Sequence, residues 1–168
     1  MSKKVRNLTY AALLAALYVG LCLLQNAIIP GSATWVIQFR AAEALCVLAF
    51  FTPAAIPGLS IGCFLFNLVY AYARPLDPIV GTAATWLSCS VMYATRRIRI
   101  KGFPLVGLLM PALFNAILVG WELSVYIGGG FFLNALYVAI GEAAVLLTLG
   151  SVLYYALTAR GLDKRLFS

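Results

Sequence analysis

Three short clusters of basic residues lie at the ends of long apolar stretches, and their placement constrains how the chain can fold. They hold ten of the twelve lysines and arginines: Lys3, Lys4, Arg6, Arg96, Arg97, Arg99, Lys101, Arg160, Lys164 and Arg165. Cytoplasmic loops of membrane proteins are enriched in Lys and Arg. The clusters therefore predict an integral membrane protein in which the start, the middle and the end of the chain lie on one side of the bilayer.

The composition supports a membrane protein and argues against several other classes. The chain has 168 residues, of which 64% are hydrophobic and 10% charged, whereas about 25% of residues in soluble domains are charged. The net charge is +7, and the basic residues that produce it flank apolar spans. We therefore interpret them as residues that set the membrane topology and contact lipid headgroups, and we expect no nucleic acid partner. The sequence has no histidine and no C-x-x-C pair, so we expect no metal and no cofactor.

Four stretches are apolar and long enough to be membrane helices, namely residues 8–29, 79–94, 103–121 and 132–157, since crossing the hydrocarbon core takes roughly 20 residues. The region 38–72 is harder to interpret because Pro53, Pro57 and Gly58 interrupt it. It is either one long helix or two shorter helices joined at residues 52–58.

The distribution of charge decides between these two interpretations. One helix would give five spans and would carry two basic clusters across the membrane, at a large cost for each charge. Two helices give six spans and keep all three clusters inside. We therefore predict an all-α integral membrane protein, a single domain over residues 1–168, with six transmembrane helices and both termini cytoplasmic in a bacterial plasma membrane. The predicted outer connections are residues 30–37, 73–78 and 123–131.

With this topology, four acids fall in the outer half of the bundle. Glu43, Asp77 and Glu122 lie near outer helix ends, and Glu142 lies about ten residues into the last helix, roughly 15 Å along it. An ionisable residue in a membrane helix costs several kcal/mol, so it usually lines a cavity or a ligand path. These four carboxyl groups therefore predict a polar site open to the outside.

Other polar and aromatic residues extend the candidate site. Asn115 shares a helix face with Glu122, seven residues on, and aromatic rings near the outer end would form either flat walls or an interfacial belt. An i,i+3 ion pair is the alternative interpretation of Arg40 with Glu43. The predicted substrate-binding residues are Glu142, Glu122, Asn115, Asn67, Trp121, Tyr70, Arg40, Glu43, Asp77 and Trp35. Such a site suits a planar ligand rich in N–H donors.

The first helix carries a different signal. Its four alanines, Ala11, Ala12, Ala15 and Ala16, form two overlapping small-x-x-x-small steps. Small residues four apart let another helix approach closely. They predict a docking face for a partner protein, although alanine is also common in membrane helices generally.

The sequence offers no support for catalysis. It contains no G-x-x-x-x-G-K-[ST] phosphate-binding loop and no soluble stretch long enough to bind ATP. Without histidine, the common nucleophile–base pairs cannot form. We therefore expect a non-catalytic protein.

Several motifs resemble a known family. Residues 38–67 read QFRAAEALCVLAFFTPAAIPGLSIGCFLFN, and four shorter motifs follow, namely Leu76-Asp77 with Gly81-Thr82, Asn115-Ala116, Gly120-Trp121-Glu122 and Gly141-Glu142. Together they resemble the QueT family of substrate-binding (S) components of energy-coupling factor (ECF) transporters. The resemblance spans nearly the whole chain, and the alanine steps match the pattern by which S components dock.

The resemblance implies a six-helix S-component fold with an outward-facing pocket for a 7-deazaguanine, either queuine or an aminomethyl or cyano precursor of queuosine. It also implies a transmembrane coupling subunit and two cytoplasmic ATPases, with the S component toppling in the bilayer to carry ligand inward. A carboxylate, Glu142 or Glu122, would accept hydrogen bonds from the guanine-like edge, with Asn115 and Asn67 assisting. Residues 32–37 would form part of a lid.

Two other functions remain open at this point. A stand-alone proton-coupled carrier would use Glu142 or Glu122 as a proton site, but such carriers often show inverted repeats, and no convincing repeat is present. The other open function is that of a small intramembrane enzyme that uses paired carboxylates.

Overall fold

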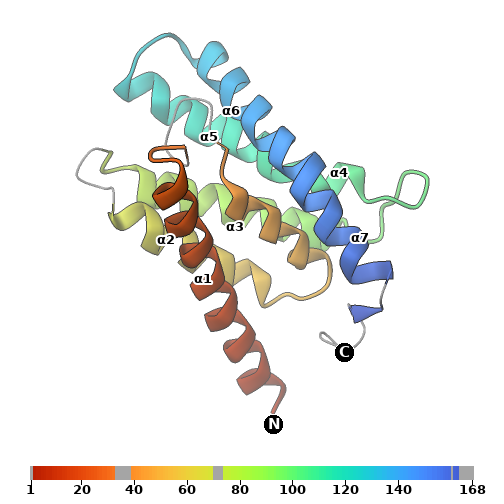
Figure 1. Ribbon diagram of the computed structural model, residues 1–168. Helices are drawn as coiled ribbons and strands as arrows, with labels where there is room; N and C mark the ends of the chain where they lie inside the picture. The colour runs from red at the N-terminus through yellow and green to blue at the C-terminus, as the bar shows by residue number, and fades with distance from the viewer. Residues whose placement is uncertain (1, 33–38, 70–73, 160, 163–168) are drawn as a thin grey trace.

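The computed structural model describes residues 2–32, 39–69, 74–159 and 161–162, and this part of the chain is built from helices (Figure 1). In chain order the elements are α1 (Lys3–Ile28), η1 (Ala41–Phe50), α2 (Ala55–Val69), α3 (Asp77–Ala94), α4 (Leu105–Leu108), α5 (Met110–Tyr126), α6 (Phe131–Val145), η2 (Leu146–Gly150) and α7 (Ser151–Ala159). The last three run on as one helix over Phe131–Ala159, and α4 joins α5 over Leu105–Tyr126. The predicted all-α fold with six helices is confirmed.

The two ends of the bundle differ in charge. The start of α1 and residues 96–103 lie toward the bottom and right of Figure 1, whereas residues 127–130 lie at the opposite corner. We call the first the basic end and the second the far end. Three helices are long and apolar enough to cross a membrane, namely Lys3–Ile28, Leu105–Tyr126 and Phe131–Ala159. In such a setting the helix itself must satisfy the backbone hydrogen bonds, which explains why the chain is helical throughout its apolar stretches.

The break predicted in the region 38–72 is present, but it is shorter than expected. The turn occupies residues 51–54, and α2 already begins at Ala55, so Pro57 and Gly58 lie in the first turn of α2. Proline is tolerated there because its missing N–H would have no helical partner. Helix α5 likewise extends to Tyr126, which shortens the predicted connection at residues 123–131 to residues 127–130.

Element η1 lies at the centre of the bundle, where it packs against α1, α2, α3, α6, η2 and α7. It is a 3₁₀ helix of ten residues, whereas runs longer than three or four residues are uncommon. A 3₁₀ helix rises about 2.0 Å per residue, so ten residues cover roughly 20 Å against 15 Å for an α-helix. The short segment can therefore reach most of the way between the two ends. It packs on the π-helical turn η2 of the last helix.

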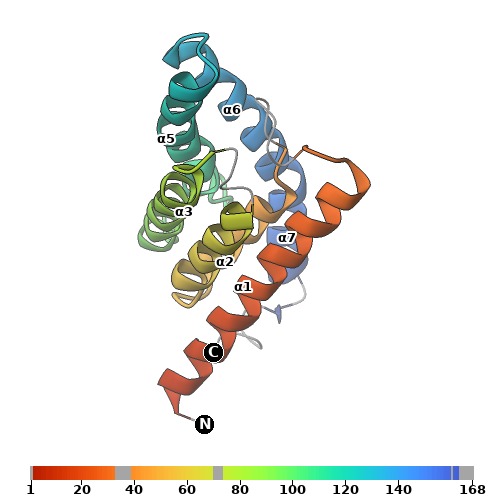
Figure 2. The ribbon, with the colours of Figure 1, turned by 90° about the vertical axis from the view of Figure 1, so that its left-hand side faces the viewer.

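Two close helix contacts fix the frame around η1. Helix α1 lies directly on α2 (Figure 2), where a Cβ atom added at Gly58 would lie 2.7 Å from the carbonyl oxygen of Ala11, and one at Gly62 would lie 2.7 Å from Cβ of Tyr18. Helix α5 approaches α6 in the same way, since a Cβ at Gly120 would lie 2.7 Å from Cα of Ala135. Glycine at these positions removes the side chain that would hold the helices apart.

Candidate functional site

Seven of the ten predicted substrate-binding residues are buried within the bundle. Each has less than 5% of its surface exposed: Arg40, Glu43, Asn67, Asp77, Asn115, Glu122 and Glu142. Arg40 directly precedes η1, and the other six lie on η1, α2, α3, α5 and α6, which all direct polar side chains inward. Burial of so many polar groups in an apolar chain is costly unless hydrogen bonds or a ligand compensate.

The remaining three predicted residues are not part of this buried group. Trp121 on α5 is 50% exposed, so its ring lies on the outer surface of the bundle next to the buried Glu122. Trp35 and Tyr70 lie outside the described residues, as does most of the predicted lid at residues 32–37. Of the lid, Ser32 is described, and its hydroxyl oxygen accepts a hydrogen bond of 2.9 Å from the Gln25 amide.

Glu43 is satisfied by the protein itself. The Tyr18 hydroxyl on α1 donates to Glu43 Oε1 at 2.5 Å, and the Cys46 thiol lies 3.3 Å from Glu43 Oε2. The second contact follows from the 3₁₀ geometry, in which side chains three residues apart lie above one another. Glu43 therefore holds α1 against η1, and both of its carboxylate oxygens already have partners.

Arg40 directly precedes η1 and lies close to several of the buried acids. Its Nη1 lies 3.7 Å from the Cys63 sulfur on α2. Its charge also interacts with the carboxyl groups of Asp77, Glu122 and Glu142. A buried guanidinium group in this position offsets part of the mutual repulsion of the carboxylates.

Asn67 and Asp77 link the end of α2 to the start of α3. Asn67 Nδ2 donates to the backbone oxygen of Asp77 at 3.2 Å and lies 3.5 Å from Cys63 Sγ. The guanidinium of Arg74 lies 3.7 Å from Asp77 Oδ2. This linkage places the Asp77 side chain next to Glu122 on α5, with which it interacts electrostatically.

Several buried acceptor atoms lack a hydrogen-bond donor within the described part of the chain. They are Asn67 Oδ1, Asp77 Oδ1, Glu122 Oε1, Glu122 Oε2 and Glu142 Oε2. A buried acceptor without a donor costs about 1–3 kcal/mol, and more when it is charged. The described buried group holds four carboxyl groups and, with Arg74, two guanidinium groups. It is therefore acidic and rich in acceptors, and it suits a ligand that brings N–H donors.

Reasoning from the sequence missed two residues that organise this region. Tyr18 was not distinguished from other aromatic residues, yet it is fully buried and bonded to Glu43. Gln25 donates to the backbone oxygen of Phe39 and accepts a hydrogen bond of 2.8 Å from the Ala41 N–H. Tyr18 and Gln25 are seven residues apart on one face of α1, so a polar stripe at helical spacing was the signal available.

We expect Tyr18→Phe to lower the melting temperature of the purified protein. The substitution keeps the ring but leaves Glu43 Oε1 buried without its donor, at a cost of about 1–3 kcal/mol. Thermal unfolding in detergent measures the effect, with Tyr155→Phe as the matched control because Tyr155 is 57% exposed. Equal melting temperatures for the two variants would show that the Tyr18–Glu43 contact contributes nothing to stability.

The structure separates the two alanine steps of α1 onto different faces. Ala11 and Ala15 are buried against α2, where they meet Gly58 and Gly62. Ala12 and Ala16 are exposed. A docking face for another protein can therefore use Ala12 and Ala16, whereas Ala11 and Ala15 are already engaged within the chain.

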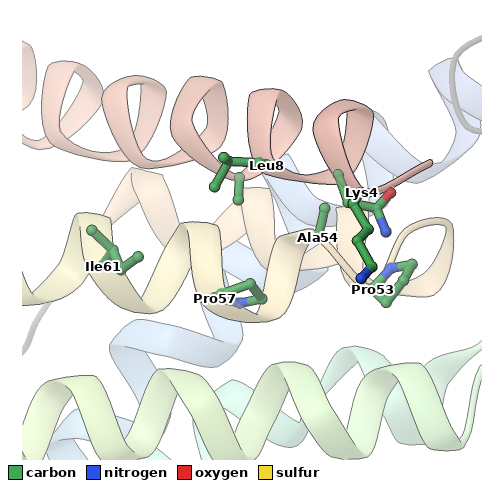
Figure 3. Close-up of a pocket in the computed structure, with 8 residues that line it drawn as sticks. Lys4, Leu8, Pro53, Ala54, Pro57 and Ile61 are labelled. Carbon is green, nitrogen blue, oxygen red and sulfur yellow. The ribbon is translucent and has the colours of Figure 1, made fainter. Parts of the chain in front are cut away.

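A separate groove lies at the basic end, between the start of α1 and the start of α2 (Figure 3). It has a volume of about 420 Å³ and is lined by Lys4, Asn7, Leu8, Ala11, Pro53, Ala54, Pro57 and Ile61. This lining is mostly apolar and contains no acid. The groove therefore does not belong to the acidic group, whose α2 member Asn67 lies toward the other end of that helix.

Comparison with models of known protein families places the chain in a family. The family model described as QueT transporter matches residues 8–159, nearly the whole chain. No curated protein and no solved structure matches the chain. The family match agrees with the resemblance drawn from the sequence motifs.

Proposed function

The chain belongs to the QueT transporter family, and on that premise we propose that it is the substrate-binding component of an ECF importer for a 7-deazaguanine. It is a membrane transport protein, and it works with a coupling subunit and two cytoplasmic ATPases. The observation that carries the proposal is the group of buried acceptors without donors, which include Glu122 Oε1, Glu122 Oε2 and Glu142 Oε2. The basic end faces the cytoplasm, as the positive-inside rule requires, so ligand enters from the far end.

The chemistry of a 7-deazaguanine matches this acceptor-rich site. The ring presents a 2-amino group and ring N–H groups along one edge, and a carboxylate can accept two such donors at once. Glu142 or Glu122 accepts this edge, and the side-chain amides of Asn67 and Asn115 supply further hydrogen bonds. Each of these residues is at least 96% buried, so their hydrogen bonds to the ligand form away from water. A donor or acceptor left without a partner there costs free energy of binding.

Energy for import comes from partner subunits, because the sequence contains no phosphate-binding loop. The exposed face of α1 formed by Ala12 and Ala16 docks on the coupling subunit. Gly20, one turn further along, extends this face, since an added Cβ there would meet no atom of the described residues within 4 Å. Small residues at this spacing let a partner helix approach the backbone of α1 closely.

A stand-alone proton-coupled carrier is the second candidate, because buried carboxyl groups in membrane proteins also serve as proton sites. The two functions differ in their requirement for partners. Binding of 7-deazaguanines to the purified chain, together with ATP-dependent uptake only when the coupling subunit and ATPases are co-reconstituted, supports the importer. Uptake by the chain alone in liposomes, driven by a proton gradient, would overturn the importer and establish the carrier.

We expect Glu142→Gln to weaken 7-deazaguanine binding at least tenfold. Hydrogen bonds to charged groups contribute about 1.5–3 kcal/mol, and glutamine also replaces one acceptor by a donor. Calorimetric titration of the purified protein measures the dissociation constant. Thr148→Val is the control on the same continuous helix, since its exposed hydroxyl donates to the backbone oxygens of Ala144 and Val145 on its own helix. Unchanged affinity in Glu142→Gln would remove Glu142 from the site.

A further inference from the structure

We propose that the groove at the basic end binds one anionic phospholipid of the cytoplasmic leaflet, with the lipid phosphate beside Lys4 and an acyl chain along the apolar part of the groove. The groove lies between the starts of α1 and α2 (Figure 3). The inference goes beyond the proposed function, because it concerns a second ligand at a site separate from the buried acids.

The groove has the polarity of a phospholipid along its length. Lys4 and Pro53 lie at one end of it, and Leu8, Pro57 and Ile61 lie further along (Figure 3). Because an α-helix rises 1.5 Å per residue, Leu8 lies roughly 6 Å further along α1 than Lys4. The volume of about 420 Å³ is within the range of roughly 300–1,000 Å³ that small-molecule sites occupy.

The depth of the groove in the bilayer fits the same ligand. Lys4 belongs to the first basic cluster, and the apolar span of α1 begins at Leu8. The ammonium group therefore lies at the level of the lipid headgroups, whereas Leu8 and Ile61 lie at the level of the acyl chains. Both of these apolar side chains are exposed, so the groove opens sideways into the hydrocarbon region, where an acyl chain can enter it.

The base of the groove can accept an apolar chain without leaving backbone donors unmet. The first turn of a helix has N–H groups without helical partners, and in a membrane each of these is costly. At the start of α2 the N–H of Ala54 donates to Thr52 Oγ1 at 3.3 Å, and the N–H of Ala55 donates to the backbone oxygen of Thr52 at 3.3 Å. The N–H of Ile56 donates to the backbone oxygen of Pro53 at 3.2 Å.

The charge of the groove favours an anionic lipid. The polar side chains in its lining are Lys4 and Asn7. An ammonium group has donors and no acceptor, and an amide supplies two further donors. The four acids that the structure describes are all in the buried group, and none of them lines the groove. Anionic lipids of the cytoplasmic leaflet attract such basic positions, whereas a choline headgroup would bring a second cation close to Lys4.

The test is native mass spectrometry of the purified full-length protein, titrated with phosphatidylglycerol or with phosphatidylcholine that carries the same acyl chains. The wild type is expected to bind one phosphatidylglycerol at a saturable site, about fivefold more tightly than phosphatidylcholine, which is the effect of one basic residue near an anionic surface. Lys4→Gln should lose most of this preference. Lys3→Gln is the matched control, because Lys3 is an exposed lysine next to Lys4 that does not line the groove.

A second pair of variants tests the apolar part of the groove. Ile61→Trp places a larger ring in the path of the acyl chain, and it should weaken both lipids about fivefold or more, the effect of losing one or two buried methylene groups. Phe64→Trp is its control, because Phe64 is also exposed on α2 and lies outside the lining. All four side chains are exposed, so each variant is expected to keep the melting temperature of the wild type.

The possible outcomes separate the lipid site from its alternatives. Equal binding of the two lipids by the wild type, or an equal loss of preference in Lys3→Gln and Lys4→Gln, would show a general attraction to the basic end and overturn the site. Absence of saturable lipid binding, together with failure of Ile61→Trp to assemble with the coupling subunit, would assign the groove to a partner helix instead. Neither result affects the proposed importer, because the lipid titrations involve no 7-deazaguanine and no ATP.

Discussion

Replacing Gly62 by leucine is expected to abolish correct packing of α1 on α2 and, with it, ligand binding. A Cβ atom at position 62 already lies 2.7 Å from Cβ of Tyr18 and 2.9 Å from the carbonyl oxygen of Ala15. One of these obstacles is backbone, so rotation of a side chain cannot relieve the clash. Overpacking of a core costs about 1–3 kcal/mol when the surroundings can adjust, and more when they cannot. Displacement of Tyr18 would also remove the hydrogen bond to Glu43.

Size-exclusion profiles and thermal unfolding in detergent measure this effect. Gly20→Leu, on the other helix of this contact, is the matched control, because an added Cβ at Gly20 meets no atom within 4 Å in the part of the chain that the structure describes. That variant is expected to unfold like the wild type. A Gly62→Leu protein with wild-type melting temperature and affinity would show that α1 and α2 do not pack as described.

Replacing both Ala12 and Ala16 by leucine is expected to eliminate ATP-dependent uptake while leaving ligand affinity unchanged. Both side chains are exposed on α1, so larger ones disturb no internal contact. They would hold a partner helix away from the α1 backbone, because close approach of helices in a membrane depends on small residues at the contact. The expected result is therefore a protein that binds but does not transport.

Two measurements are needed, namely calorimetric binding to the purified chain and uptake by the complete reconstituted complex. Ala83→Leu is the control, since Ala83 is an exposed alanine on α3, away from the proposed docking face. Uptake that survives in the double variant would exclude this face of α1 as the docking surface. Loss of binding would show instead that the alanines support the fold.

Much of the fold follows from where charge and proline interrupt apolar runs. The basic clusters required an even number of spans, and Pro53 marked the break that separates η1 from α2. The type of helix could not be predicted. A 3₁₀ helix in residues 41–50 and a π turn in residues 146–150 arise where η1 and η2 pack on each other, and this tertiary contact leaves no signature in hydropathy.

The candidate site was predictable where a residue type is rare in its setting. Carboxyl groups are rare in apolar helices and therefore indicate a polar site. The four acids that carried this prediction, Glu43, Asp77, Glu122 and Glu142, are all buried. Hydropathy did not show which acid already has partners, because the Tyr18 hydroxyl that satisfies Glu43 lies 25 residues away in the sequence.

The spacing of residues alone could not predict which faces of α1 and α5 turn toward the interior of the bundle. Ala11 with Ala15 and Ala12 with Ala16 have the same four-residue period, yet only the first pair lies against glycines of α2. Trp121 follows a similar rule, since its neighbour Glu122 turns inward and Trp121 is half exposed. In each case a rotation of about 100° per residue separates buried from exposed positions. Which of these positions faces the interior depends on how the helix packs against its neighbours.

Mass spectrometry of the small molecule that co-purifies with the protein tests the central claim most directly. The claim is that buried acceptors without donors hold a nitrogen-rich planar ligand. The wild-type protein is expected to carry a 7-deazaguanine, and Glu142→Gln prepared in parallel is expected to carry much less. A co-purifying molecule without an N–H-bearing ring edge, or equal retention by Glu142→Gln, would contradict the account.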